Sequence, residues 1–231
     1  MRSIKAIFIK QTKDMLKNFS VLIMFILFPL VAFAMTKLVA EGIDDLPKTI
    51  FTTMMASIFI GMSLIMSSAG VIAEDRENKS LRFLVIAGVK PHSYLLGIGG
   101  VIFIASFFTS VAFGFIGQFN RNDFFSFLAI MMSGSIASIL LGATVGIFSK
   151  NQQAATGLSM PLAMILGFGP MVAQFNSQAE KIFRIFYTQQ INVVVNDFSA
   201  GIAKPLVVIW INIAVLAVLF SLAYGKKGLR N

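Results

Sequence analysis

Six long apolar stretches alternate with short polar segments along the chain. A helix needs about 20 apolar residues to cross the hydrocarbon core of a bilayer, and each stretch is close to that length or longer. The pattern therefore predicts an all-α, polytopic membrane protein with six transmembrane helices in a single transmembrane domain. The expected spans are residues 19–36, 49–73, 93–117, 124–149, 154–173 and 205–224.

The segment between the second and third spans, residues 74–91, differs from every other part of the chain. It carries seven charged side chains, which are too costly to bury in hydrocarbon, so we expect it in water at a membrane face. Apolar residues recur within it at i, i+3 and i+4, with charged residues on the other side, and this spacing predicts a short amphipathic helix suited to a partner. An ordinary solvated loop is the alternative. The apolar positions are Leu81, Leu84 and Val85, and the charged ones are Glu74, Asp75, Arg76, Glu77, Lys79, Arg82 and Lys90.

Two further segments have amphipathic spacing. Residues 1–18 place apolar side chains opposite lysines, as in a basic helix that lies along the membrane interface. Residues 176–204 are too polar to span but keep a helical stripe, which predicts one or two re-entrant helices at the outer interface.

Small residues recur every four positions in the fourth and fifth spans. Such repeats let two helices approach closely in a membrane, within one chain or between two. In the fifth span, the two glycines and the proline of residues 167–170 predict a break near its outer end. The positions expected in helix packing are Gly134, Ser138, Gly142, Gly146, Ala155, Ala163 and Gly167.

Composition supports a membrane protein, since 57% of residues are hydrophobic and 13% charged. The net charge of +9 could indicate nucleic-acid binding, but the basic residues cluster at span ends, which instead indicates orientation in a bilayer. Of the 19 lysines and arginines, 13 lie in the terminal segments, in residues 74–91 and at Lys150. The distribution places these segments and both termini in the cytoplasm.

The sequence offers little chemistry of its own. It has no cysteine and a single histidine, His92, which excludes thiolate chemistry and a His/Cys metal cluster. It also lacks a phosphate-binding loop of the G-x-x-x-x-G-K-[ST] type, and no charged residue lies in the middle of a span. We therefore expect no catalytic residue, no metal, no directly bound cofactor and no ion relay, so that energy for any transport would come from another subunit.

The order of these elements resembles the permease subunits of ABC-2 type transporters over essentially the whole chain. Residues 1–18 resemble the interfacial helix of that family, 71–84 and 88–97 the two sides of its coupling helix, 149–154 the turn before the fifth span, and 176–204 the re-entrant helices. One departure is Lys79-Ser80, where the family often has glycine and threonine.

The resemblance implies an exporter subunit in the cytoplasmic membrane, paired with a second permease chain, identical or different. The compact size, six spans with short loops, suits a bacterial resistance or peptide-export system. It also implies two copies of a separate ATPase subunit that bind ATP and Mg²⁺. The coupling segment would dock on that ATPase. The implied partner-binding residues are Glu74, Asp75, Arg76, Glu77, Lys79, Leu81, Arg82, Phe83 and Leu84.

The cargo route implied by the resemblance lies between two permease chains and is walled by spans one, two and five. The chain's 24 phenylalanines favour a hydrophobic or amphipathic cargo such as a drug, an antimicrobial peptide or a lipid. A sensor or immunity protein that binds such peptides without moving them, and a channel without a partner, are the alternatives. The polar candidates for the route are Ser57, Ser63, Ser67, Thr156 and Ser159, each of which could instead bond its own helix.

Overall fold

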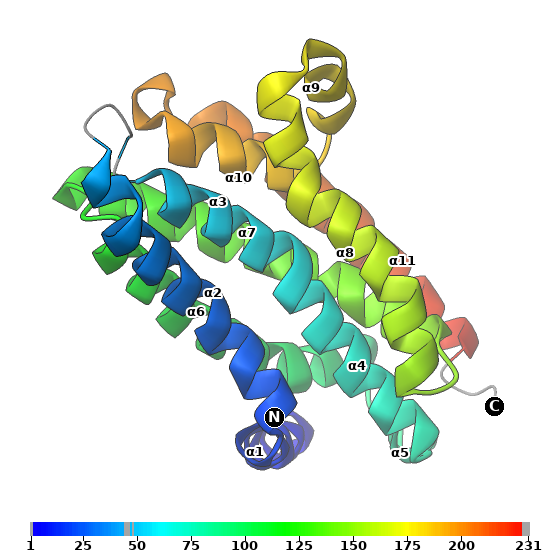
Figure 1. The fold of residues 1–231 in the computed structure, drawn as a ribbon. Helices are drawn as coiled ribbons and strands as arrows, with labels where there is room; N and C mark the ends of the chain where they lie inside the picture. The colour runs from blue at the N-terminus through cyan, green and yellow to red at the C-terminus, as the bar shows by residue number, and fades with distance from the viewer. Residues whose placement is uncertain (1, 44–46, 48, 228–231) are drawn as a thin grey trace.

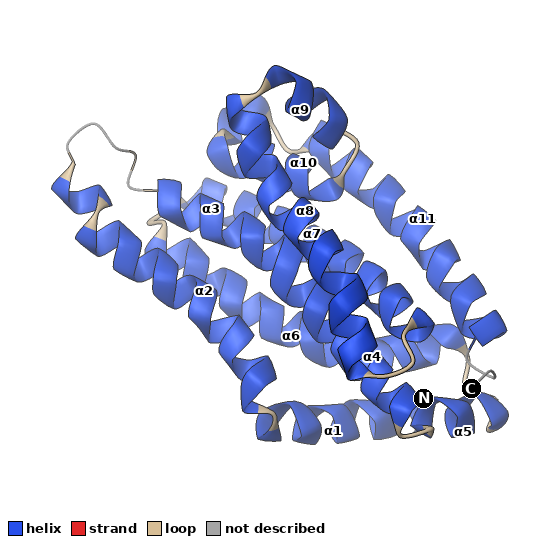
Figure 2. Ribbon diagram, turned by 45° about the vertical axis from the view of Figure 1, so that its right-hand side comes forward, coloured by secondary structure: helices blue, strands red, loops and turns tan. Residues whose placement is uncertain are grey.

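The structure, a computed structural model, describes residues 2–43, 47 and 49–227, and these residues form helices and connecting turns without a strand (Figures 1 and 2). The elements are α1 (Arg2–Lys17), α2 (Phe19–Leu38), η1 (Ala40–Gly42), α3 (Ile50–Ile58), η2 (Phe59–Ser63), α4 (Leu64–Glu77), α5 (Ser80–Ile86), α6 (Pro91–Ile116), α7 (Arg121–Phe148), α8 (Gln152–Phe175), α9 (Ser177–Phe183), α10 (Tyr187–Asn196), η3 (Phe198–Ala200) and α11 (Ala203–Lys227).

The all-α fold with six spans is confirmed, because six helical segments are long and apolar enough to cross a membrane. Several of these helices extend beyond the spans expected from the sequence. The third begins at Pro91, since proline suits the first helical turn, where its missing N–H has no partner in any case.

The second span, α3–η2–α4, lies at the centre of the bundle. In its most apolar stretch 78% of residues are buried, against 22% in the first and last spans. Glycines on α7 allow this central helix to approach, because a Cβ at Gly142 would lie 2.3 Å from the carbonyl oxygen of Ile65. A Cβ at Gly146 would meet the carbonyl oxygen of Ala69 at 2.7 Å. The two helices therefore pack backbone to backbone.

The centre of this span is a turn of π-helix, η2, where the regular hydrogen-bond ladder is interrupted. The hydroxyl of Ser138 on α7 donates to the carbonyl oxygen of Ile60 at 2.7 Å. On the other side of η2, Gly61 lies against Gly167 of α8, where an added Cβ would be 2.6 Å from the Gly167 backbone. The π-turn is thus held between two neighbouring spans.

The expected break in the fifth span is wrong, because α8 continues as one helix to Phe175. Proline at position 170 removes one backbone hydrogen bond, a loss that membrane helices tolerate. Gly169 instead serves packing: a Cβ there would lie 2.1 Å from the ring of Phe183 on α9.

Short elements cover the two ends of the bundle (Figures 1 and 2). At one end, here called the terminal face, lie α1, α5, the turn between α7 and α8, and the C-terminal end of α11. At the opposite face α9 and α10 occupy the segment expected to be re-entrant, and eight of the ten residues of α10 are buried.

Candidate functional site

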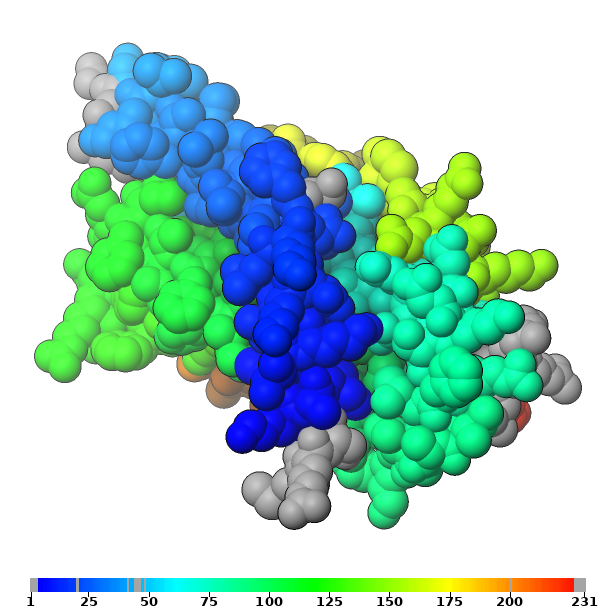
Figure 3. All heavy atoms as spheres, turned by 90° about the horizontal axis from the view of Figure 1, so that it is seen from below, coloured from blue at the N-terminus to red at the C-terminus, as the bar shows by residue number. Residues whose placement is uncertain are grey.

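The short helix α5 connects α4 to α6 and lies on the terminal face (Figures 1 and 3). Residues with positive φ bracket it: Lys79 at 59° on one side and Gly88 at 76° on the other. These turns separate α5 from the two spans that it joins. Within α5, the side chain of Leu81 is fully buried, while those of Phe83 and Ile86 are 69% and 64% exposed. The helix thus presents an apolar surface to water.

The acidic cluster does not share this helix, contrary to the expected arrangement. Glu74, Asp75 and Glu77 instead form the last turn of α4, which ends only where Asn78 and Lys79 leave helical geometry. Apolar periodicity did not reveal this boundary, because the polar last turn of α4 and the amphipathic α5 follow each other after a two-residue connection.

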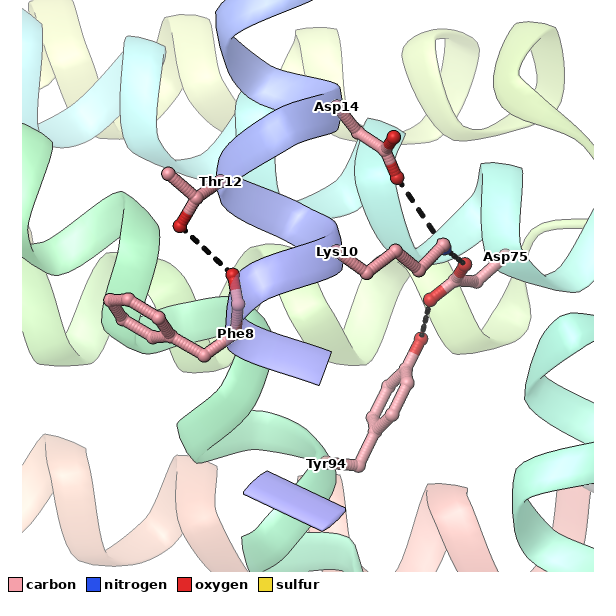
Figure 4. Close-up of polar contacts among 6 residues, drawn as sticks. All are labelled: Phe8, Lys10, Thr12, Asp14, Asp75 and Tyr94. Atoms are coloured by element: carbon pink, nitrogen blue, oxygen red, sulfur yellow. Dashed lines mark hydrogen bonds and ion pairs between the residues drawn. The ribbon is translucent and has the colours of Figure 1, made fainter. Parts of the chain in front are cut away.

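Asp75 is a buried carboxylate at the junction of three helices (Figure 4). It accepts a hydrogen bond from the ammonium of Lys10 on α1 at 2.6 Å and another from the hydroxyl of Tyr94 on α6 at 3.0 Å. Burial lowers the pKa of Lys10, but the hydrogen bond and charge of Asp75 raise it more, so the net pKa is above the usual value. The pair therefore ties α1 to the end of α4 by a charge-assisted contact.

The next two residues of the turn reach the other spans. Arg76 donates to the carbonyl oxygens of Ile147 and Ser149, at the C-terminal end of α7 where helix carbonyls lack partners. Glu77 accepts a hydrogen bond from the backbone N–H of Gln152, at the start of α8, at 3.1 Å. A carboxylate at a helix N-terminus and a guanidinium at a C-terminus both match the helix dipole.

Three consecutive side chains thus connect the last turn of α4 to four other helices: α1, α6, α7 and α8. We call residues 75–77 the junction turn. A second set of contacts adjoins the junction turn. The rings of Tyr94 and Tyr224 pack at a tilt with their centroids 5.5 Å apart, and the Tyr224 hydroxyl donates to the carbonyl oxygen of Val89.

The expected partner-binding residues divide into two groups. Asp75 and Leu81 lie in the interior of this chain, and the assignment of the nine residues to a partner stays a prediction. The exposed residues are Glu77, Lys79, Arg82 and Phe83, and the half-buried ones are Glu74, Arg76 and Leu84. The outward group is concentrated on α5 and its leading turn.

The candidate route residues differ in burial, and their place on a route between two permease chains stays a prediction. Ser57, Ser63, Ser67 and Ser159 are buried, whereas Thr156 is exposed and bonds the carbonyl of Gln152 in its own helix. Three of the serines bond neighbouring helices: Ser63 donates to the Met24 carbonyl, Ser67 contacts the Met24 sulfur, and Ser57 accepts from Asn192.

The expected packing residues lie at helix contacts. Besides the α7 glycines described above, Gly134 lies against Ile191 of α10, and Ser138 shares a hydrogen bond of 2.9 Å with the Tyr187 hydroxyl. Ala155 and Ala163 on α8 are fully buried.

The sequence did not single out Lys10, Tyr94 or the polar cluster that joins α10 to the end of α8. In that cluster the Asn192 amide oxygen accepts from Gln174 at 2.8 Å and from Asn196 at 3.1 Å. Each of these residues stands in an amphipathic or apolar segment, where a single polar position carries no distinctive pattern. No group of three or more potential metal ligands occurs in the described part of the chain.

A sequence profile of the ABC-2 family transporter proteins matches residues 46–224. No curated protein matches the sequence. The matched region contains α5, the junction turn and the five spans from α3 to α11, although α1 and α2 precede it. Because the profile covers more than three quarters of the 231 residues, the chain belongs to the ABC-2 transporter family.

Proposed function

We propose that this chain is the permease subunit of an ATP-driven ABC-2 type exporter. It moves a hydrophobic or amphipathic molecule, such as a drug, an antimicrobial peptide or a lipid, across the cytoplasmic membrane. The observation that carries the proposal is α5, a short helix that presents exposed Phe83 and Ile86 at the bundle's end while the adjacent junction turn contacts four other helices. Family membership supports this assignment.

The partner that we assign to α5 is a separate ATPase subunit, present in two copies that bind ATP and Mg²⁺. Phe83 and Ile86 provide apolar anchors of the kind that dominate protein interfaces, and Arg82 lies beside them at the rim. Lys79 begins the helix in a left-handed turn, which directs α5 away from the axis of α4.

The mechanism follows from the contacts of the junction turn. When ATP closes the two ATPase subunits, α5 moves with them and displaces the end of α4. The bonds of Asp75, Arg76 and Glu77 carry this displacement to α1, α6, α7 and α8 as rigid elements. Alternating movement of these helices would open and close the cargo route.

A second permease chain, identical or different, would form the other wall of that route. In support, the first and fifth spans leave rows of apolar side chains exposed, which a soluble surface would not tolerate and which either lipid or a partner can cover. On α2 these include Ile26, Leu30 and Phe33, and on α8 Leu162, Ile165 and Val172.

The excess of basic residues on the terminal face supports a cytoplasmic position for α1, α5 and both termini. An ATPase docked on α5 would then lie in the cytoplasm, where ATP is available. Cargo would leave through the face covered by α9 and α10.

Inverted vesicles from native membranes test the proposed export. A fluorescent phospholipid, a lipophilic dye and a fluorescent antimicrobial peptide are offered with and without ATP. We expect ATP-dependent accumulation of at least one, abolished by Phe83→Asp on α5 and retained in Ile182→Asp on α9, a matched position that is 64% exposed on the opposite face. Peptide binding without accumulation of any probe would contradict export and favour a sensor.

A further inference from the structure

A polar pocket of about 390 Å³ lies where α1, the start of α2 and the end of α4 meet on the terminal face. This volume falls within the range of small-molecule sites. The pocket is separate from the exposed surface of α5, because neither Phe83 nor Ile86 lines it. The proposed export mechanism uses the Lys10–Asp75 contact in the wall of this pocket, but it assigns no role to the space inside it.

Gln11 of α1 lines the pocket and is only 4% exposed, yet its side chain forms no hydrogen bond with any described residue. An amide that lines a pocket can form its hydrogen bonds only with water or a ligand inside that pocket when the protein supplies no partner. Gln11 therefore offers a hydrogen-bonding group that a ligand in the pocket can satisfy.

The charges around the pocket favour a cationic ligand group. Three carboxylates, Asp14, Glu74 and Asp75, face two amines, Lys10 and Lys17. Lys10 is already engaged by Asp75 at 2.6 Å and Asp14 at 3.7 Å. Glu74 has neither an ion pair nor a side-chain hydrogen bond within the described ranges, so its carboxylate is available to an ammonium.

The remaining wall is apolar and faces the first span. Met15, Phe19, Val21 and Val71 line this side, and Phe19 is 75% exposed at the start of α2. A ligand with a polar head among the carboxylates could therefore extend an alkyl or acyl chain along α2. The pocket combines a charged end with an apolar exit, which is the profile of an amphiphile.

We propose that this pocket binds the ammonium head group of an amphiphile. Glu74 and Asp14 accept hydrogen bonds from the ammonium, Gln11 supplies a further polar contact, and the chain lies against Phe19 and Val21. Such a head group can come from a bilayer phospholipid with a primary amine or from a soluble cationic amphiphile. The proposal concerns binding by this chain alone, so it stands or falls independently of ATPase docking and export.

Binding to the purified full-length chain in detergent tests the proposal. The probes are dihexanoyl-phosphatidylethanolamine, dihexanoyl-phosphatidylglycerol, decylamine and decanol, with dissociation constants from calorimetry. We expect at least one amine probe to bind and the two amine-free probes to bind at least about tenfold more weakly, because they lose a charge-assisted hydrogen bond. Binding of the phosphatidylethanolamine identifies a bilayer source, and binding of decylamine alone identifies a soluble amphiphile. Equal binding of amine and amine-free probes, or none at all, overturns the proposal.

Two substitutions locate the binding within the pocket. Glu74→Gln should weaken amine binding about tenfold or more, whereas Glu180→Gln, an exposed carboxylate on α9, should leave it unchanged. Gln11→Leu should lower amine affinity and leave the melting temperature without ligand unchanged or higher, because it removes a side-chain amide that lines the pocket without a hydrogen bond to the described residues. A purely structural role for Gln11 predicts a lower melting temperature instead. Unchanged amine affinity in Glu74→Gln, with the fold intact, would overturn the assignment.

Discussion

Tyr94→Phe removes a single hydroxyl group from the junction between α4 and α6, and its cost measures how firmly the junction turn is held. The Tyr94 ring is fully buried and packs at a tilt against the ring of Tyr224, and phenylalanine preserves this packing. The hydroxyl donates to a buried carboxylate at 3.0 Å. Hydrogen bonds to charged groups contribute about 1.5–3 kcal/mol, so we expect the substitution to lower the free energy of unfolding by about 2 kcal/mol.

Unfolding of the detergent-solubilised protein by sodium dodecyl sulfate provides the assay. Tyr224→Phe is the control, because its hydroxyl donates to the neutral carbonyl of Val89 and should cost only about 1 kcal/mol. In an Asp75→Asn background the bond of Tyr94 becomes neutral, so the cost of Tyr94→Phe should fall to about 1 kcal/mol. A cost below about 0.5 kcal/mol, or the same cost in both backgrounds, would refute the charged junction.

Three further predictions concern helix contacts, each measured by the same unfolding assay. Gly142→Ala should destabilise the protein by about 2 kcal/mol or more, because its Cβ would collide with the α4 backbone. The control Gly157→Ala, whose Cβ would meet no atom within 4 Å, should be neutral or slightly stabilising. Equal effects of the two substitutions would contradict the close packing of α4 and α7. Ser138→Ala should cost about 2 kcal/mol, since it leaves a tyrosine hydroxyl and a carbonyl of the π-turn unpaired, and more than Ser133→Ala, which loses only a bond within its own helix. Lys79→Gly should stabilise or leave unchanged the start of α5, because glycine adopts a φ of 59° without steric cost, and a loss above about 1 kcal/mol would refute that backbone geometry.

The spans could be predicted from sequence because an apolar stretch of sufficient length has one stable arrangement in a bilayer, a helix. The helix α5 also follows from local pattern, since Leu81 and Leu84 have helical spacing next to charges. The boundary before α5 could not be predicted, because Lys79 carries no signal for the left-handed conformation that it adopts.

The contacts of the junction turn also lie beyond sequence reasoning. The seven charges in residues 74–91 predicted that Asp75 lies in water, yet its side chain is buried. Burial is possible because Lys10, 65 positions earlier in the chain, and Tyr94, 19 positions later, donate hydrogen bonds to its carboxylate. Only the packing of α1 and α6 against α4 brings these groups together. The same holds for Asn192 and Gln174, whose hydrogen bond joins α10 to the end of α8.

The most direct test of the central claim is recovery of an ATPase with this chain from native membranes in mild detergent. We compare the unmodified chain with the Arg82→Glu, Phe83→Asp double variant on α5 and with Ile182→Asp on α9 as the matched control. The account predicts that an ATP-binding subunit accompanies the unmodified chain and the control but is lost from the double variant, whose unfolding profile is unchanged. Recovery of the ATPase with all three chains, or with none of them, would contradict docking through α5.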